Sequence, residues 1–90
     1  MTFKFKDLFF SRELRFSIGQ EEITGKQYIS FPVRNPYVEY EEYYALSDNQ
    51  FMSFMENPNN ALIYLEECRD RRHDDLMLFY NPNLLRGTTN

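Results

Sequence analysis

The sequence predicts an α+β fold, an antiparallel sheet of four to five strands with two helices packed on one face, in the order β-β-β-β-α-α-β. Three observations predict it. Apolar and polar residues alternate in the first half of the chain, apolar residues recur with helical spacing after Ser47, and a short apolar run follows. Ninety residues, 42% of them hydrophobic, suit one core and leave no room for a second, so residues 1–90 are expected to form a single domain.

The first three strands are predicted from period-two alternation, which places every second side chain on one face. The alternating apolar residues are Phe3 and Phe5 in a strand over about 2–9, Leu14, Phe16 and Ile18 in the second strand, and Ile29, Phe31 and Val33 in the third. Gly19 and Gly25 bracket a polar stretch that is expected to be a loop. Pro32 has no amide proton, so the third strand is expected to lie at an edge or to leave the sheet there.

The segment YVEYEEYYAL, residues 37–46, allows two interpretations. Tyrosine and valine favour a strand. Tyr37, Tyr40 and Tyr44 would also share one face of a helix, which Asn35-Pro36 could begin. We favour the strand, because a strong helix-start signal follows only at Ser47.

Two helices are predicted next. Ser47 and Gln50 have the spacing of a capping box, which begins a helix over 48–56 with Phe51, Phe54 and Met55 on its apolar face. Asn57-Pro58 ends this helix and precedes a second one over about 59–71. The apolar stripe of the second helix is Ala61, Leu62, Leu65 and Cys68, and the sheet's Phe and Ile side chains are expected to face Leu62, Leu65, Phe51 and Phe54. The apolar run 76–80 predicts a last strand, and residues 84–90 a frayed tail.

The net charge of −4 conceals an acidic block in the middle of the chain. Residues 37–67 carry seven acidic side chains and no lysine or arginine, whereas 1–36 carry a net charge of +2 and 68–90 a net charge of +1. A field of one sign repels nucleic acid phosphates and attracts a basic partner. The plainer interpretation is a solvated face that keeps the protein soluble.

The sequence offers little for catalysis, so we expect no enzyme, no cofactor and no metal. His73 is the only histidine, and Cys68 has the position of a small core residue. Glu66, Asp70 and His73 would share a helical face and could ligate a metal, but the arginines among them oppose a cation. The basic run 69–73 suits a helix C-terminus, so direct nucleic acid binding is not expected. No phosphate-binding glycine motif occurs.

The N-terminal segment is charged from Lys4 onward and shows neither a signal peptide nor a membrane span, which indicates a cytoplasmic protein with Cys68 reduced.

The best candidate for a functional surface is YVEYEEYY, residues 37–44. In a strand, Tyr37, Glu39, Glu41 and Tyr43 lie on one face, expected to meet solvent, and Val38, Tyr40, Glu42 and Tyr44 lie on the other. Carboxylates accept bidentate bonds from arginine, and tyrosine supplies amphipathic contact area. The residues expected to bind a partner are Tyr37, Glu39, Tyr40, Glu41, Glu42, Tyr43 and Asp48. The alternative is that the tyrosines cover the core and the glutamates are ordinary surface residues.

In size, acidity, the YVEYEEYY block and the following SDNQFMSFMENP segment, the chain resembles bacterial immunity proteins of the contact-dependent growth inhibition type. The resemblance implies tight 1:1 binding to a cognate basic toxin domain, often a nuclease, over or beside its active site. A phage-encoded inhibitor of a host nucleic-acid-handling complex, such as an anti-CRISPR protein, shares these features. A small homo-oligomeric structural or regulatory protein is the other alternative. The chain itself is expected to be a monomer or a weak homodimer.

Overall fold

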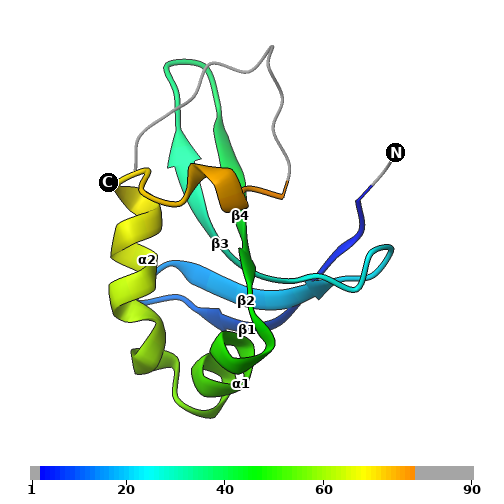
Figure 1. Cartoon of the computed structure of the whole chain (residues 1–90). Helices are drawn as coiled ribbons and strands as arrows, with labels where there is room; N and C mark the ends of the chain where they lie inside the picture. The colour runs from blue at the N-terminus through cyan, green and yellow to red at the C-terminus, as the bar shows by residue number, and fades with distance from the viewer. Residues whose placement is uncertain (1–2, 79–90) are drawn as a thin grey trace.

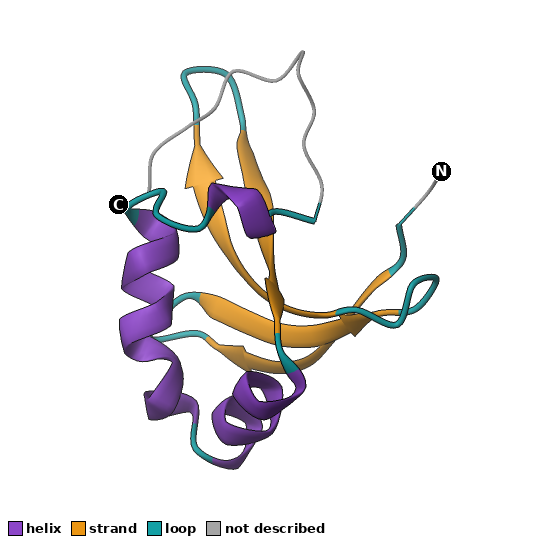
Figure 2. Ribbon diagram, viewed as in Figure 1, coloured by secondary structure: helices purple, strands orange, loops and turns teal. Residues whose placement is uncertain are grey.

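The computed structural model describes residues 3–78 and shows a four-stranded antiparallel sheet with helices on one side (Figures 1 and 2). The strands are ordered β1-β2-β3-β4. The elements are β1 (Phe5–Ser11), β2 (Phe16–Glu21), β3 (Gln27–Arg34), β4 (Glu39–Leu46), α1 (Asp48–Glu56), η1 (Pro58–Ala61), α2 (Leu62–Arg69) and η2 (Asp74–Leu76). The α+β class and the order β-β-β-β-α-α are therefore confirmed.

A fifth strand is not seen in the described part of the chain. Met77 forms an isolated antiparallel bridge with Tyr44, and the amide of Leu78 donates to the carbonyl of Tyr43 at 2.9 Å. The rest of the predicted strand over 76–80, and the predicted tail over 84–90, lie outside the described residues.

The first hairpin differs from its prediction at two points. β2 begins at Phe16 rather than Leu14, because residues 12–15 form the turn, which closes with a 2.8 Å hydrogen bond from the Arg15 amide to the Ser11 carbonyl. Gly19 was expected to open a loop, but it lies inside β2, opposite Asp7 and Tyr28. The register shifts between Asp7 and Phe9, and this bulge at Leu8 moves Phe9 onto the face that carries the core.

Pro32 lies in β3, which is an interior strand of the sheet but has separated from β2 before it reaches Pro32, in line with the second of the two predicted alternatives. Pairing between β2 and β3 ends at Ser30, whereas β3 continues beside β4 as far as Arg34. Figure 1 shows this extension, where β3 and β4 run on beyond β2. Pro32 therefore lies where β3 has only β4 beside it, and this explains how a residue without an amide proton is accommodated.

The capping box is confirmed. The Gln50 amide donates to Ser47 Oγ at 3.1 Å, and the Ser47 amide donates to Gln50 Oε1 at 2.8 Å. The first helix has the predicted bounds. The second begins as η1, with Asn57 Oδ1 accepting from the Asn59 amide at 3.2 Å, and ends at Arg69, two residues earlier than predicted.

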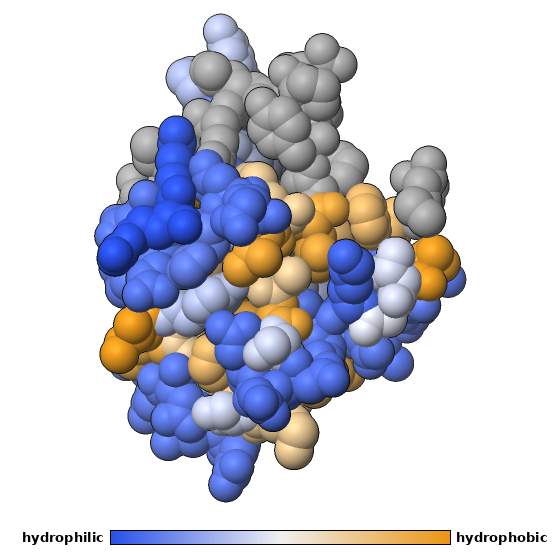
Figure 3. Space-filling view, in the orientation of Figure 1, coloured by the Kyte–Doolittle hydropathy of each residue, from blue (hydrophilic) through white to orange (hydrophobic). Residues whose placement is uncertain are grey.

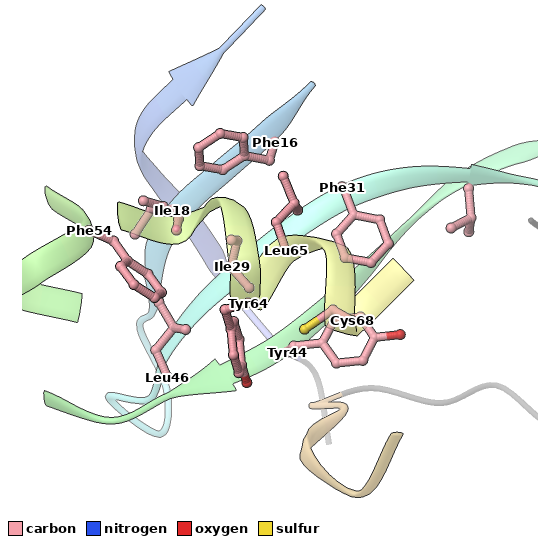
Figure 4. Packing of buried hydrophobic residues seen from close by; sticks show 12 residues of the cluster. Phe16, Ile18, Ile29, Phe31, Tyr44, Leu46, Phe54, Tyr64, Leu65 and Cys68 are labelled. Carbon is pink, nitrogen blue, oxygen red and sulfur yellow. The ribbon is translucent and has the colours of Figure 1, made fainter. Parts of the chain in front are cut away.

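The core lies between one face of the sheet and the two helices (Figure 4). Its buried residues are Phe16, Ile18, Ile29, Phe31, Val33, Tyr44, Leu46, Phe54, Ala61, Tyr64, Leu65 and Cys68. Phe51 and Leu62 pack against this cluster while partly buried, so the predicted contact of the sheet with the helices is confirmed. Tyr64, which sequence reasoning did not place in the core, donates from its hydroxyl to the Ala45 carbonyl at 2.9 Å.

Arg69 fixes the end of α2 to the sheet. Its guanidinium lies 5.5 Å from the centre of the Phe31 ring, donates to the Leu14 carbonyl at 3.0 Å and pairs with Glu66 at 3.1 Å. The first member of the basic run therefore has an architectural role.

Glu21 is a buried carboxylate that organises the β2–β3 turn. Its oxygens accept hydrogen bonds from the amides of Lys4, Ile23 and Thr24 and from the Thr24 hydroxyl, at 2.5 to 2.9 Å. Burial acts to raise the pKa of Glu21, but these donors outweigh it and lower the pKa to about 2.

Replacement of Leu65 by alanine should cost about 2–5 kcal/mol of folding free energy, because the side chain is fully buried between helix and sheet. Ile63 on the same helix is 77% exposed, so Ile63→Ala is the matched control and should change stability by less than about 0.5 kcal/mol. Urea denaturation measures both. Equal losses of folding free energy in Leu65→Ala and Ile63→Ala would contradict the assignment of Leu65 to the buried face of α2.

Glu21→Gln should destabilise the protein at neutral pH, since the carboxylate that collects four donors is lost. The folded pKa of Glu21 lies below its ordinary value, so its contribution is present above pH 4.5 and is lost as pH falls toward about 2. Denaturation midpoints measured across this range should fall steeply for the native protein and less steeply for Glu21→Gln. The exposed neighbour Glu22, changed to Gln, is the control, and a native-like slope in Glu21→Gln would contradict the assignment.

Candidate functional site

The candidate surface is the face of β4 that points away from the helices, together with the turn before it. Glu39, Glu41 and Tyr43 alternate with residues directed at the core, so the predicted strand and its two faces are confirmed for Glu39–Leu46. The predicted start at residue 37 is wrong, because Tyr37 and Val38 lie in the turn before β4. We call the side of the sheet that carries these three residues the outer face.

The predicted partner-binding residues do not all belong to the outer face. Glu42 is 4% exposed and accepts hydrogen bonds from the Tyr44 hydroxyl at 2.7 Å and the Tyr40 hydroxyl at 3.2 Å. Glu42 and the half-buried Tyr40 therefore lie on the core side, and Glu42 is not available at the surface. Asp48 is exposed, but it lies in the first turn of α1.

The turn between β3 and β4 presents Tyr37 to solvent on a well-ordered backbone. The buried Asn35 accepts from the amides of Tyr37 and Val38 at 2.8 Å each, and its own amide donates to the Val38 carbonyl at 3.0 Å. Pro36 fixes one further backbone angle. Tyr37, 87% exposed, is thus held by the backbone while its ring is in solvent.

Glu39 is surrounded by basic groups that the local sequence did not indicate. Arg34 on the facing strand and Arg15 on the β1–β2 turn each approach its carboxylate to 3.7 Å, and all three side chains are about half exposed or more. Exposed pairs of this kind contribute little to stability. The two arginines nevertheless offset the negative charge of Glu39, at the N-terminal end of the acidic block.

The acidic block does not form one acidic surface. Its carboxylates are distributed over the outer face, the core, α1 and α2. On α2, Glu66 pairs with Arg69 at 3.1 Å, and Glu67 lies 2.8 Å from His73 Nε2. The acids are therefore dispersed, and the continuous field suggested by the sequence is not seen in the described residues.

Glu41 differs from Glu39 because its charged surroundings are mainly acidic. Partial burial raises the pKa of Glu41 most, Asp7 and Glu39 raise it further, and Arg15 alone acts to lower it. Asp7 comes from β1, at the other edge of the sheet. This proximity could not be predicted from the sequence, since the two residues are 34 positions apart.

A contact between aromatic rings explains how β1 reaches β4. The rings of Phe5 and Tyr43 are stacked with their centres 3.7 Å apart, and both meet the Tyr28 ring edge-on, at 5.3 and 5.1 Å. In a flat sheet, strands three positions apart would be separated by about 14 Å. The sheet must therefore twist strongly, and the side chains must lean toward each other across β2 and β3.

Gly19 makes this contact possible. The Tyr28 ring lies over Gly19, and its hydroxyl donates a hydrogen bond to Asp7 on β1. We call the group formed by Phe5, Asp7, Tyr28, Glu41 and Tyr43 the β1–β4 seam. Burial and the nearby carboxylates raise the pKa of both tyrosines, so their hydroxyls remain protonated and able to donate.

The residues considered for metal binding or catalysis have other contacts. Because α2 ends at Arg69, Asp70 and His73 do not continue a helical face from Glu66. His73 stacks on Tyr64, with ring centres 4.8 Å apart, and burial raises the pKa of Cys68 to about 12. Within residues 3–78, no group of three or more His, Cys, Asp and Glu side chains is arranged to hold a metal ion.

None of the helices in the described residues has the length and apolar character needed to span a bilayer. Comparison of the chain with protein-family models, with curated proteins and with solved structures finds no match in any of the three.

Gly19→Ala should destabilise the fold by at least about 1–3 kcal/mol, the usual range for overpacking. An added Cβ would lie 2.1 Å from the Lys6 carbonyl oxygen and 2.6 Å from the Tyr28 hydroxyl, so β1 or Tyr28 would have to move. Gly25→Asn is the control, because a Cβ there would make only an ordinary contact with Gln20 Nε2 at 3.9 Å, and asparagine is the side chain that best tolerates the φ of +75°. An unchanged denaturation midpoint in Gly19→Ala would contradict the packing of Tyr28 over β2.

Proposed function

We propose that this protein acts by binding a basic protein partner through the β3–β4 turn and the adjoining outer face of β4. The observation that carries this proposal is the presentation of Tyr37. An aromatic side chain that is 87% exposed on a turn held by three hydrogen bonds has lost backbone entropy before any partner arrives.

The chemistry next to Tyr37 supports a cationic partner. Four residues after Tyr37, Glu41 on β4 points outward, and the ion pairs found within residues 3–78 do not include it. Its neighbour Asp7 adds a second carboxylate. A partner arginine or lysine placed here would relieve the repulsion between them and form charge-assisted hydrogen bonds.

The finer form of the proposal is an immunity protein that neutralises a cognate basic toxin domain, of nuclease type, by tight 1:1 binding in the bacterial cytoplasm. Small size, a net charge of −4 and exposed aromatic residues support it. The dispersal of the acids favours attachment beside the toxin's active site over imitation of a nucleic acid backbone. A phage-encoded inhibitor would use the same surface on a different target.

A homo-oligomer is a second candidate, favoured by β1. This strand is an edge of the sheet, and Phe10 and Leu8 on it are 60% and 46% exposed. The surface in Figure 3 is mostly hydrophilic with separate apolar areas. Pairing through β1 would not require Tyr37 or Glu41, so their substitution separates this candidate from the first.

Glu41→Lys should weaken partner binding by about tenfold or more, because it places a cation beside the partner's cation. The control is Glu56→Lys, the same charge change on α1, away from the candidate surface. The native protein and both variants are used as baits in extracts of the source organism. The protein that the native chain and Glu56→Lys retain, and Glu41→Lys loses, is then purified for titration.

Tyr37→Ala should weaken the same complex without changing the denaturation midpoint, because the ring makes little contact with the rest of the fold. Equal retention by all baits, or a retained partner that is acidic, would contradict the proposal. Loss of binding only in variants of Leu8 and Phe10 would favour the homo-oligomer.

A further inference from the structure

The β1–β4 seam combines an attraction and a repulsion at one place. The attraction is the stacking of Phe5 on Tyr43, which joins strands that are not neighbours in the sheet. The repulsion is between Asp7 on β1 and Glu41 on β4, whose carboxylates act electrostatically on each other and on Tyr43. Because the same two strands carry both, any change in the repulsion acts on the aromatic contact.

The groups that face Glu41 offset its charge only in part. Asp7 from β1 and Glu39 from β4 have the same sign, and Arg15 from the β1–β2 turn has the opposite sign. Arg15 is shared, since its guanidinium also approaches Glu39 to 3.7 Å. Tyr28 and Tyr43 are neutral donors, and the Tyr28 hydroxyl is already committed to Asp7.

We propose that the β1–β4 seam is a pH-responsive clasp, in which ionised Glu41 beside Asp7 loosens the contact of Phe5 with Tyr43 and protonated Glu41 tightens it. The proposal goes beyond partner binding and does not depend on it. The moving part is the first half of β1, which lies at the edge of the sheet and is followed by the bulge at Leu8. An edge strand of this kind can shift without dismantling the core on the other face.

The direction of the pH response follows from the surroundings of Glu41. Its folded pKa is raised above the ordinary value of 4.5, so the folded protein binds this proton more tightly than the unfolded chain does. The stability that it contributes is present below pH 4.5 and is lost as pH rises through the raised pKa. Glu21 acts in the opposite direction and at lower pH, so the two responses occur in separate windows.

The test uses the isolated protein and the variant Glu41→Gln, which is isosteric and uncharged. Denaturation midpoints and nuclear Overhauser contacts between the Phe5 and Tyr43 rings are measured near pH 4.5, the ordinary pKa of a glutamate, and near pH 8. In the native protein, the midpoint and the ring contact should both decrease as pH rises. Glu41→Gln should keep the tight contact at both pH values and should have a higher denaturation midpoint than the native protein near pH 8, because it lacks the charge that repels Asp7.

Two further variants identify the cause of the response. Asp7→Asn retains an oxygen that can accept from Tyr28 and should reduce the pH response of the ring contact. Phe5→Ala removes the ring that joins β1 to β4. In this variant, the denaturation midpoint should no longer show the pH dependence that Glu41 causes. Glu56→Gln on α1 controls for the general loss of a carboxylate.

Parallel pH profiles for the native protein and Glu41→Gln would overturn the clasp, as would a ring contact that does not change with pH. Because no partner takes part in these measurements, that outcome would leave the binding proposal standing. Conversely, loss of partner binding in Tyr37→Ala would test the binding proposal alone, because Tyr37 takes no part in the clasp.

Discussion

The packing of Tyr28 over Gly19 is the constraint on which the outer half of the structure depends. Any side chain at position 19 would meet the backbone of Lys6 and the phenol of Tyr28, so the close approach of β1, β2 and β3 requires glycine there. The approach lets the Tyr28 hydroxyl reach Asp7. It also allows the Phe5 ring on β1 to stack on the Tyr43 ring on β4. The sheet therefore has two packed faces, an extensive one beneath the helices and a smaller aromatic one opposite.

The two faces deal with carboxylates in different ways. Glu21 and Glu42 are buried, and each is satisfied by donors from its own surroundings, backbone amides and a threonine in one case and two phenols in the other. Buried polar groups are tolerated only with such partners. Glu41 on the outer face has like charges beside it instead. Within residues 3–78, no ion pair or hydrogen bond is found for the Glu41 carboxylate. This is the physical reason to propose a role for it in recognition or in regulation.

Local signals in the sequence predicted local structure well. The bounds of α1 follow from Ser47 and Gln50, whose mutual hydrogen bonds involve only residues three apart, so no tertiary information was needed. The strand over 37–46 was predicted from composition and from the start signal at Ser47, and the alternation of its faces followed. Glu42 shows the limit of that reasoning. Alternation predicts which face of the strand carries Glu42, but its burial depends on the Tyr40 and Tyr44 hydroxyls that donate to it in the fold.

The remaining differences arise from contacts between distant segments. Gly19 looked like the start of a loop because glycine is common there, and only the Tyr28 ring on the next strand explains its place inside β2. Pro32 suggested an edge position for β3. The observed solution, in which β3 continues beyond its pairing with β2, could not be predicted because it depends on the lengths of both strands. The acidic block looked continuous in the sequence because the arginine that offsets part of it is distant in the chain. Arg15 pairs with Glu39 from the β1–β2 turn, 24 positions earlier.

These long-range contacts also change what the outer face can recognise. At the turn, Glu39 is held between Arg15 and Arg34, and further along the strand Glu41 lies near Asp7, so positive and negative groups follow one another beside the exposed Tyr37. A uniformly acidic surface would attract any basic protein, with little discrimination. An ordered sequence of charges next to a fixed aromatic ring requires a partner whose own charges match it in position, because a misplaced cation would meet the arginines. If the outer face binds a partner as proposed, this arrangement favours selective binding of one partner over general attraction to basic surfaces.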